Sequence, residues 1–281
     1  MADPDPNGLQ PIAIAVAPNG GRRTKADHPA LPVTTDEIVA TAAACLEAGA
    51  CMIHVHIRDR HGGHLLDVDA YRTAIAAVQA AVGDRLVIQI TSEALGIYKS
   101  AQQMAIVREV RPEAVSLALR ELAPDARDET AFADFLTGLR QENTTPQIIL
   151  YSPEEAVRLA ELNKRGVILF DDVPVLYVLG RYAVGQRSSP NDLLPFLAPG
   201  MPRFAHWSVC AFGARENACV ATAALLGGHA RVGFENNLWL PDGSVAPDNA
   251  ALVAAARATL GTCNLAAATA AQLRAAWAAM T

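Results

Sequence analysis

Two histidines lie close together in a short apolar run of the chain. The run 51–57 predicts a β-strand, in which alternate side chains share a side, so His54 and His56 project together. Two imidazoles about 6–7 Å apart along a strand can converge on one metal ion, because metal–nitrogen bonds are about 2.0–2.1 Å long. The alternative is a pair of buried, hydrogen-bonded core histidines. Two histidines facing one interior are hard to satisfy without a ligand, which favours the metal site.

A catalytic metal ion needs a third protein ligand and an open coordination position. The best carboxylate for this role is Glu235, at the carboxyl end of the last predicted strand, 231–235. In the alternative arrangement, Glu235 pairs with Arg231 on the same face of that strand. His206 and His229 are weaker candidates, because each stands alone in the sequence.

Hydroxyl groups near the ends of two other predicted strands are candidate substrate contacts. They belong to Thr91 and Ser116, whose alternative roles are those of an ordinary strand threonine and a helix-cap serine. Neither has the His and Asp neighbours of a nucleophilic triad. The glycine-rich loop 19–25 carries three positive charges, including Arg22. It could receive an anionic substrate, although a solvated basic loop is the commoner explanation.

The elements that must position these residues follow a regular order, in which short β-branched runs alternate with Ala- and Leu-rich segments. The predicted strands are 12–17, 51–57, 86–91, 114–119, 147–151, 173–179, 204–209 and 231–235. The predicted helices are 34–48, 69–81, 101–110, 129–141, 153–164, 190–197, 214–226 and 247–260. Eight βα units at roughly 35 residues each match the about 250 residues of a (β/α)8 TIM barrel.

The competing architecture is an open doubly wound sheet. The loop 17–22 after the first predicted strand lacks the G-x-G-x-x-G pattern that opens a dinucleotide-binding helix, which favours the barrel. The Ala-rich segment 265–280 predicts a final helix packed outside the barrel. No Pro-, Gly- or Ser-rich linker divides the chain, so we expect a single α/β domain over 1–281.

The overall composition narrows the class of protein. The chain has 281 residues, of which 51% are hydrophobic and 19% charged, so it is not intrinsically disordered. No apolar stretch is long enough for a membrane span, and a net charge of −6 without basic blocks argues against nucleic-acid binding. The polar segment 1–8 is unlike a secretory signal, and the five scattered cysteines contain no C-x-x-C pair. We therefore expect a cytoplasmic protein.

The motifs together resemble the β-keto acid cleavage enzyme family, whose founding activity is the cleavage of 3-keto-5-aminohexanoate. The resemblance covers nearly the whole chain and depends on the order of its segments. These are the loop at Asn19-Gly20, the H-x-H-x-R-D run at 54–59, Pro112-Glu113 before Ser116, Val178-Leu179-Gly180, and the run 227–235 that ends R-V-G-F-E.

Membership would imply a (β/α)8 barrel that holds one Zn²⁺ per chain on His54, His56 and Glu235. Members of the family react a β-keto acid with acetyl-CoA and release acetoacetate and a new acyl-CoA. The implied chemistry is a Claisen step followed by a retro-Claisen step, which needs no covalent enzyme nucleophile. The resemblance also implies a homotetramer.

The family also suggests roles for single residues. Thr91 and Ser116 match the hydroxyls that hold the carboxylate of the keto acid, and Arg231 matches an arginine implicated in proton abstraction. The chain departs from the family at Asn236, where the aspartate that assists this arginine is expected. Asparagine can orient Arg231 but cannot lend it negative charge. Arg22 stands where the founding activity uses a glutamate for the substrate amino group, so we predict a neutral or anionic distal group.

Two other classes of protein stay open on the residues alone. One is a metal-dependent hydrolase or aldolase, although amidohydrolases usually carry H-x-H on the first strand. The other is a non-catalytic zinc-binding barrel. The sequence holds no direct signature for acetyl-CoA, so this cosubstrate follows from the resemblance. Arg215 and the Gly227-Gly228 turn are weak candidates for phosphate contacts, with surface charge and a helix C-cap as their alternative roles.

Overall fold

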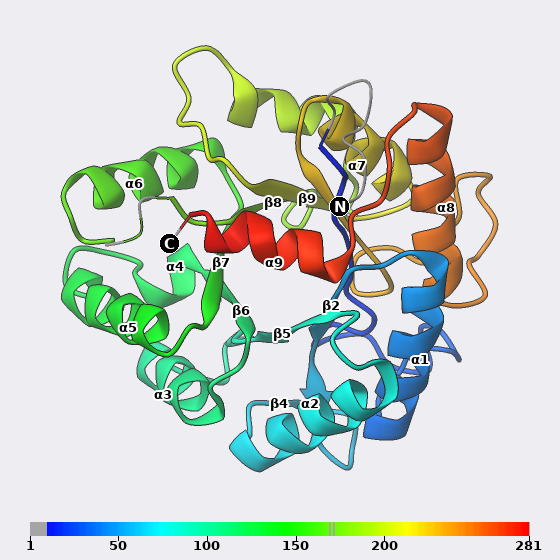
Figure 1. Cartoon of the computed structure of the whole chain (residues 1–281), viewed down its shortest axis with the longest axis horizontal. Coiled ribbons are helices and arrows are strands. Elements are labelled where there is room, and N and C mark those ends of the chain that lie inside the picture. The colour runs from blue at the N-terminus through cyan, green and yellow to red at the C-terminus, as the bar shows by residue number, and fades with distance from the viewer. Residues whose placement is uncertain (1–9, 169, 171, 281) are drawn as a thin grey trace.

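Eight parallel strands close into one barrel within the part of the chain that the computed structural model describes, residues 10–168, 170 and 172–280 (Figure 1). Their spatial order is β1-β10-β9-β8-β7-β6-β5-β2, with β1 pairing with β2 to close the ring. The bounds are β1 Ile14–Val16, β2 Met52–Val55, β5 Val87–Thr91, β6 Ala114–Ala118, β7 Thr145–Leu150, β8 Val175–Leu179, β9 Trp207–Ala211 and β10 His229–Val232. This arrangement confirms the predicted (β/α)8 barrel. The segment 1–8, on which the argument against a secretory signal was based, lies outside the described residues.

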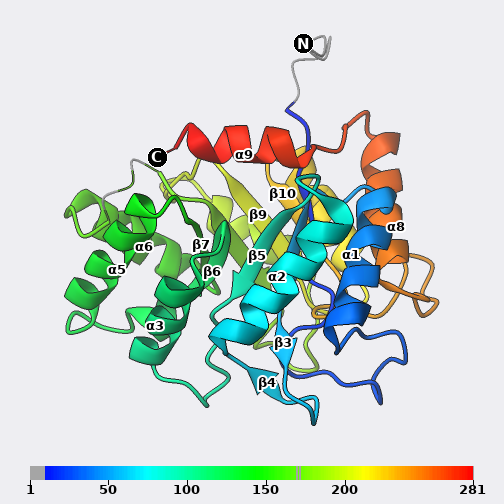
Figure 2. The ribbon, with the colours of Figure 1, turned by 60° about the horizontal axis from the view of Figure 1, so that its bottom comes forward.

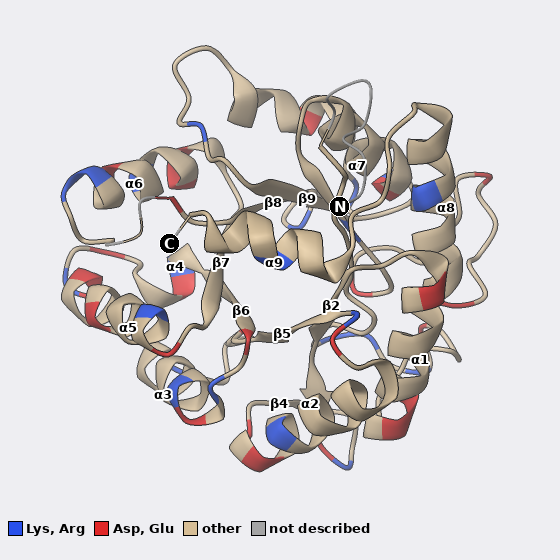
Figure 3. Ribbon diagram, viewed as in Figure 1, with Lys and Arg blue, Asp and Glu red and all other residues tan. Residues whose placement is uncertain are grey.

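Helices surround the barrel and bury its outer face. Their bounds are α1 Thr35–Ala48, α2 Val68–Val82, α3 Ser100–Val110, α4 Leu119–Leu122, α5 Glu129–Gln141, α6 Pro153–Lys164, α7 Glu216–Leu225, α8 Asn249–Thr262 and α9 Ala270–Ala278, with a 3-10 helix η1 at Pro190–Leu197. The 3-10 form of η1 accords with Pro195 inside it, because proline has no N–H for an α-helical bond. Figure 3 shows that most of the charged residues belong to the surrounding helices and loops and few to the barrel strands.

Local sequence explains why the elements begin and end where they do. Thr34 accepts a hydrogen bond from the Glu37 backbone N–H, and the Glu37 carboxylate accepts one from Thr34, so a capping box starts α1. Gly49 ends the same helix in a left-handed conformation. Most barrel strands are buried along their whole length, as expected of parallel strands covered on both faces.

Two predicted strands differ from the observed ones in ways that affect the site. The predicted strand 51–57 ends at Val55, because the side chain of Asn19 hydrogen-bonds the backbone of His56 at both its C=O and its N–H. The next residues, β3 Ile57–Arg58, form a small antiparallel hairpin with β4 His64–Leu65. The predicted strand 231–235 is replaced by β10, which ends at Val232 and leaves Glu235 in the following turn.

The two ends of the barrel are built differently. Figure 2 shows α9 lying across one end, with the β3–β4 hairpin at the opposite end. The observed helix is shorter than the predicted helix 265–280, because the residues before α9 pair with the chain just ahead of β1, where Ile12 bonds to the backbone of Ala266 and Ala268. Leu273 and Trp277 of α9 pack against the residues that begin the barrel strands. This closes the amino-terminal end and leaves the carboxyl-terminal end for the site.

Two further findings bear on the expected class of protein. All five cysteines are free, and four of them are buried. No helix among the described residues is long and apolar enough to cross a membrane.

Candidate metal centre and substrate pocket

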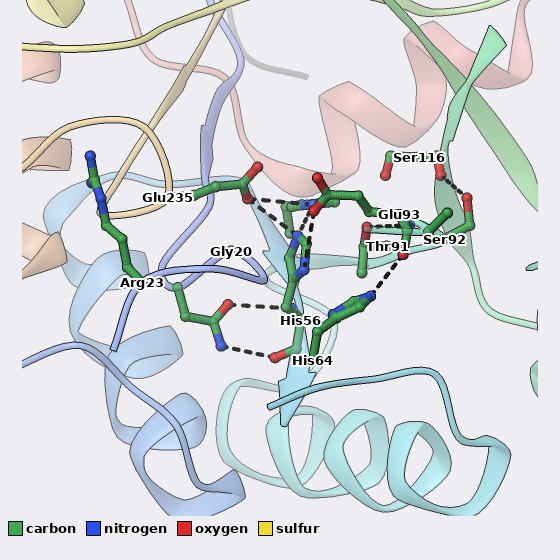
Figure 4. A network of polar contacts seen from close by, with 12 residues as sticks. Gly20, Arg23, His56, His64, Thr91, Ser92, Glu93, Ser116 and Glu235 are labelled. Atoms are coloured by element: carbon green, nitrogen blue, oxygen red, sulfur yellow. Dashed lines mark hydrogen bonds and ion pairs between the residues drawn. The ribbon is translucent and has the colours of Figure 1, made fainter. Parts of the chain in front are cut away.

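Three side chains converge at the carboxyl-terminal end of the barrel. The Nε2 atoms of His54 and His56 lie 3.1 Å apart, and Oε2 of Glu235 lies 3.7 Å from the first and 3.4 Å from the second. Both histidines are buried, at 1% exposure each. In Figure 4 the side chains of Glu235 and Glu93 approach His56. The structure therefore brings together the three residues that the sequence nominated as metal ligands.

The geometry of the three atoms fits a metal ion. In a tetrahedral site with bonds of about 2.0–2.1 Å, ligand atoms lie about 3.3–3.4 Å apart. The observed distances of 3.1, 3.4 and 3.7 Å bracket that value. Oε2 of Glu235 is buried and has no hydrogen-bond partner within the described residues, which would be costly without a ligand. The donor set of two imidazoles and one carboxylate is one that zinc uses in catalytic sites.

A chain of amides holds His54 in the required orientation. Its Nδ1 donates to Oε1 of Gln89 over 2.8 Å, which directs the unprotonated Nε2 toward the other ligands. Gln89 is placed beside His54 by the register of β2 and β5, and its Nε2 donates to Gln147 on β7 over 3.1 Å. Burial lowers the pKa of His54 to about 3, so the ring is neutral as a metal ligand must be.

Glu235 reaches the histidines because of two glycines. Gly233 has a φ of +132° and turns the chain after β10, and the Glu235 N–H then donates to the C=O of Ala17. A Cβ on Gly20 would lie 2.6 Å from Cγ of Glu235, so only glycine leaves room for this side chain. The carboxylate also accepts a hydrogen bond from Arg231 over 2.9 Å. The predicted alternative pair thus coexists with the ligand arrangement, because each contact uses a different carboxylate oxygen.

The charges of this pair are clear from their surroundings. Burial favours the neutral acid, but Arg231 and His56 hold the pKa of Glu235 well below its usual range, so it is a carboxylate. Burial would lower the pKa of Arg231, but Cys210 and Glu235 raise it above its usual value. Arg231 therefore stays a cation at the wall of the site.

The triad opens into a cavity that we call the inner pocket, lined among others by His54, Thr91, Ser116, Arg231 and Glu235. Thr91 and Ser116 are adjacent in the register of β5 and β6. The Ser116 hydroxyl is buried without a partner among the described residues, and the Thr91 hydroxyl accepts from the Glu93 N–H, which leaves its proton free. Both hydroxyls can donate to an anionic group beside the triad.

Two charged residues of the inner pocket were missed by the sequence analysis. Glu93 lies with Oε2 at 4.0 Å from Nδ1 of His56, and Arg181 lies 3.6 Å from the other Glu93 oxygen. At 3.6 Å the Arg181 donors are beyond hydrogen-bond range and stay available. Thr91 and His64 hold the backbone of Glu93. The positions of Glu93 and Arg181 in the sequence could have indicated this role. Each comes two residues after the end of a predicted strand, and the carboxyl ends of the strands are where a barrel has its active site.

Two predicted site residues lie apart from the inner pocket. Arg22 is exposed and lines a second cavity, the middle pocket, together with Arg23, Glu93 and Arg181. Asn236 is fully buried, but neither polar atom of its amide has a hydrogen-bond partner within the described residues, Arg231 included. The structure thus shows no contact through which Asn236 orients Arg231.

The turn that carries Glu235 is supported by residues that the sequence analysis did not single out. Arg23 donates to the C=O of Phe234. Glu216, at the start of α7, accepts from the N–H of Gly233 over 3.3 Å and from the Asn237 amide over 3.2 Å. Burial raises the pKa of Glu216 to about 8, so the acid is largely protonated at neutral pH. The first loop and α7 thereby fix the third ligand from both sides.

Fold and site together define a (β/α)8 barrel with a candidate metal centre at the carboxyl ends of its strands. Comparison with known proteins gives the family. A model of the beta-keto acid cleavage enzyme family matches residues 11–278, and the chain belongs to this family.

Curated relatives span most of the chain. It is 28% identical to the 3-keto-5-aminohexanoate cleavage enzyme of Fusobacterium nucleatum, over 87% of this chain and 89% of that protein. It is 26% identical to the 3-oxoadipate:acetyl-CoA acetyltransferase of Cupriavidus necator, over 95% and 94%. Among solved structures, apo ObcA superposes with a TM-score of 0.70 at 18% identity, over 89% of this chain and 66% of ObcA, which supports the fold.

Proposed function

We propose that the chain is a zinc-dependent enzyme that transfers acyl groups between a β-keto acid and acetyl-CoA. The keto acid gives up its acyl group to CoA, and the acetyl group joins the remaining two-carbon carboxylate as acetoacetate. The observation that carries the proposal is the convergence of His54, His56 and Glu235 beside the free hydroxyl of Ser116. Membership of the family and a relative named as an acetyl-CoA acetyltransferase support the same reaction.

The three ligands would hold the metal, and each residue around them has a task of its own. Bound zinc supplies Lewis acidity for the keto and carboxylate oxygens of the substrate. Ser116 and Thr91 donate hydrogen bonds to the substrate carboxylate. Glu93, the carboxylate of the inner pocket that is not one of the three ligands, takes the C2 proton of the keto acid, and the buried cation Arg231 stabilises the negative charge that this leaves on the substrate. We also assign Asn236 to this step, as the neutral residue at the position where the family has an acid.

The distal group of the substrate is selected by charge. Arg181 lines both the inner and the middle pocket, and Arg22 and Arg23 line the middle pocket farther from Ser116. These three cations outnumber the two carboxylates of the middle pocket, Glu93 and Glu235. A substrate ammonium group would meet net positive charge there, whereas a second carboxylate would be attracted. We therefore propose a keto dicarboxylate or a neutral keto acid as the substrate.

The test combines metal analysis with a substrate panel. The purified protein should contain about one zinc per chain. It should form acetoacetate from acetyl-CoA fastest with a keto dicarboxylate or a neutral keto acid, and slowest with 3-keto-5-aminohexanoate. His54→Ala should lose both zinc and acetoacetate formation, whereas His61→Ala, at an exposed histidine, should keep both. Full zinc occupancy in His54→Ala would refute the ligand assignment, and a preference for the amino substrate would refute the charge argument.

Two further outcomes of the same assay separate the open alternatives. Zinc binding without acetyl-CoA consumption for any β-keto acid would favour a non-catalytic barrel, and cleavage without acetyl-CoA would favour a hydrolase or aldolase. Asn236→Asp should raise the rate of acetoacetate formation, because a carboxylate restores the negative charge that the family has at this position and that an amide cannot lend to Arg231. An unchanged rate would remove position 236 from the proton-transfer step.

A further inference from the structure

A third cavity, the outer pocket, has an unusual charge. It encloses about 610 Å³ and is lined by Arg23, Arg187, Arg215 and Trp239, together with backbone of the loops around 185 and 213. No acidic side chain lines it, and neither Arg187 nor Arg215 forms an ion pair within the described residues. Three arginines and no acidic side chain in the lining are a local surplus of positive charge on a chain whose net charge is −6. Such a surplus is an electrostatic attraction for a polyanion.

The outer pocket is continuous with the site. The inner and middle pockets share Glu93, Arg181, Phe212 and Glu235 as lining residues, and the middle and outer pockets share Arg23 and Gln186. A path of cavities thus leads from the metal ligands to the surface. The loops around the outer pocket follow the sixth, seventh and eighth barrel strands, and barrels often bind phosphate at the loops after the last two.

Trp239 gives the outer pocket a surface on which a flat aromatic ligand can stack. Its side chain is large and 38% exposed, and its backbone is held on both sides by the Asn237 amide. An indole exposed at the rim of a cationic cavity is suited to stack on a nucleobase. The close approach of Gly213 to the backbone C=O of Gln186 joins two of the loops, since a Cβ on Gly213 would lie 2.9 Å from that oxygen.

We propose that the outer pocket binds the 3′-phosphorylated ADP end of acetyl-CoA, with Arg187 and Arg215 on the phosphates and Trp239 on the adenine. The middle pocket then takes the pantetheine arm, and the thioester reaches the inner pocket beside Glu235. Arg23 lies at the junction of the middle and outer pockets and already holds the Glu235 turn. The choice of acetyl-CoA as the ligand rests on the proposed function. The positive charge of the outer pocket is independent of that function.

The kinetic test uses acetyl donors with and without the nucleotide. Arg187→Ala and Arg215→Ala should each raise the KM for acetyl-CoA about tenfold, as expected for the loss of a charge-assisted phosphate contact. The kcat and the KM for the keto acid should stay within twofold, and the rate with acetyl-pantetheine, which lacks the nucleotide, should not change. Arg111→Ala is the matched control, because Arg111 lines another large cavity, of about 560 Å³, that does not include the metal ligands. An unchanged KM for acetyl-CoA in both variants would overturn the proposal.

A binding arm separates this inference from the proposed function. Adenosine 3′,5′-bisphosphate should bind the unmodified protein in calorimetry and quench Trp239, as judged against Trp239→Phe. Binding should weaken at least tenfold in the Arg187→Ala, Arg215→Ala double variant. This result would support the pocket even if the protein transferred no acetyl group. Equal binding by the double variant and the unmodified protein, or no binding to either, would overturn it.

Discussion

At the scale of single residues, the candidate metal centre depends on side chains that are not among its three candidate ligands. Gln89 accepts a hydrogen bond from Nδ1–H of His54 and itself donates to Gln147. Residues on β2, β5 and β7 therefore set the direction of one imidazole. Without this acceptor the ring could rotate or take the other tautomer, and its Nε2 would no longer be a fixed donor atom. The orientation of the ligand is therefore as much a property of β5 and β7 as of β2.

The His54–Gln89 hydrogen bond predicts the effect of Gln89→Leu. We expect zinc affinity to fall about 10- to 100-fold, as for the loss of other partners of metal-bound histidines, while the fold is retained. Competition with a chelator measures the change. Gln147→Leu is the control, because it leaves the His54–Gln89 hydrogen bond in place and should have a clearly smaller effect. Equal losses in the two variants would show that the amide chain acts through packing alone.

The sequence could predict which three side chains converge, but not the residues around them. His54, His56 and Glu235 are recognisable because their types and strand positions allow few other roles. Glu93 and Arg181 are ordinary charged residues in sequence, and only the closure of the barrel brings them to one cavity. Arg22 is predicted to meet the distal end of the substrate, and the structure adds the partly buried Arg181, which lines both the middle and the inner pocket.

At the scale of elements, the decisive piece is the turn after β10. The sequence placed Glu235 on a strand, but the positive φ of Gly233 ends the strand and redirects the chain. A Cβ on Gly233 would lie 2.4 Å from the Ala17 C=O, which is the oxygen that accepts the Glu235 N–H. The turn therefore needs glycine both for its backbone conformation and for its contact with β1.

Gly233→Ala should consequently damage the site as well as the fold. We expect a loss of about 2–3 kcal/mol in the free energy of unfolding and a marked fall in zinc affinity, since the Ala17 C=O must move. Gly243→Ala is the control, because it has a φ of +88° but no atom within 4 Å of its added Cβ. It should cost about 1 kcal/mol and leave zinc binding unchanged. Urea unfolding and a chelator titration measure the two quantities, and normal zinc affinity in Gly233→Ala would contradict this account.

At the scale of the whole molecule, the two ends of the barrel differ in role: α9 packs against one end, and the candidate metal ligands lie at the other. The order of βα units was predictable from the sequence, because apolar strand runs alternate with Ala- and Leu-rich segments, and some helices, such as α1 and α6, have a capping residue at their start. The position of α9 was not, because its Ala-rich sequence indicates a helix without saying which face of the barrel it covers. Only the contacts of Leu273 and Trp277 with the amino-terminal ends of the strands show it. The fold of a single chain tests neither the homotetramer nor the cytoplasmic location, and both stay predictions.

The difference between the two ends predicts the behaviour of Leu273→Ala. Leu273 is 3% exposed, so truncation should lower the free energy of unfolding by about 2–5 kcal/mol. Zinc content and kcat per folded molecule should not change, because the metal ligands lie at the other end of the barrel. Leu225→Ala, at a leucine that is 61% exposed, should alter stability by less than about 0.5 kcal/mol. Thermal unfolding and metal analysis check both variants, and a loss of zinc from folded Leu273→Ala would show that the two ends are coupled.

The closed end has a practical consequence for handling the protein. The helix α9 lies across the end of the barrel opposite the β3–β4 hairpin (Figure 2), where its Leu273 and Trp277 pack against Ala15 of β1. A surface attachment made through α9 would hold every molecule with its pockets facing the solution. Sensors or flow reactors built in this way would keep the mouth of the barrel accessible to acetyl-CoA and to the keto acid.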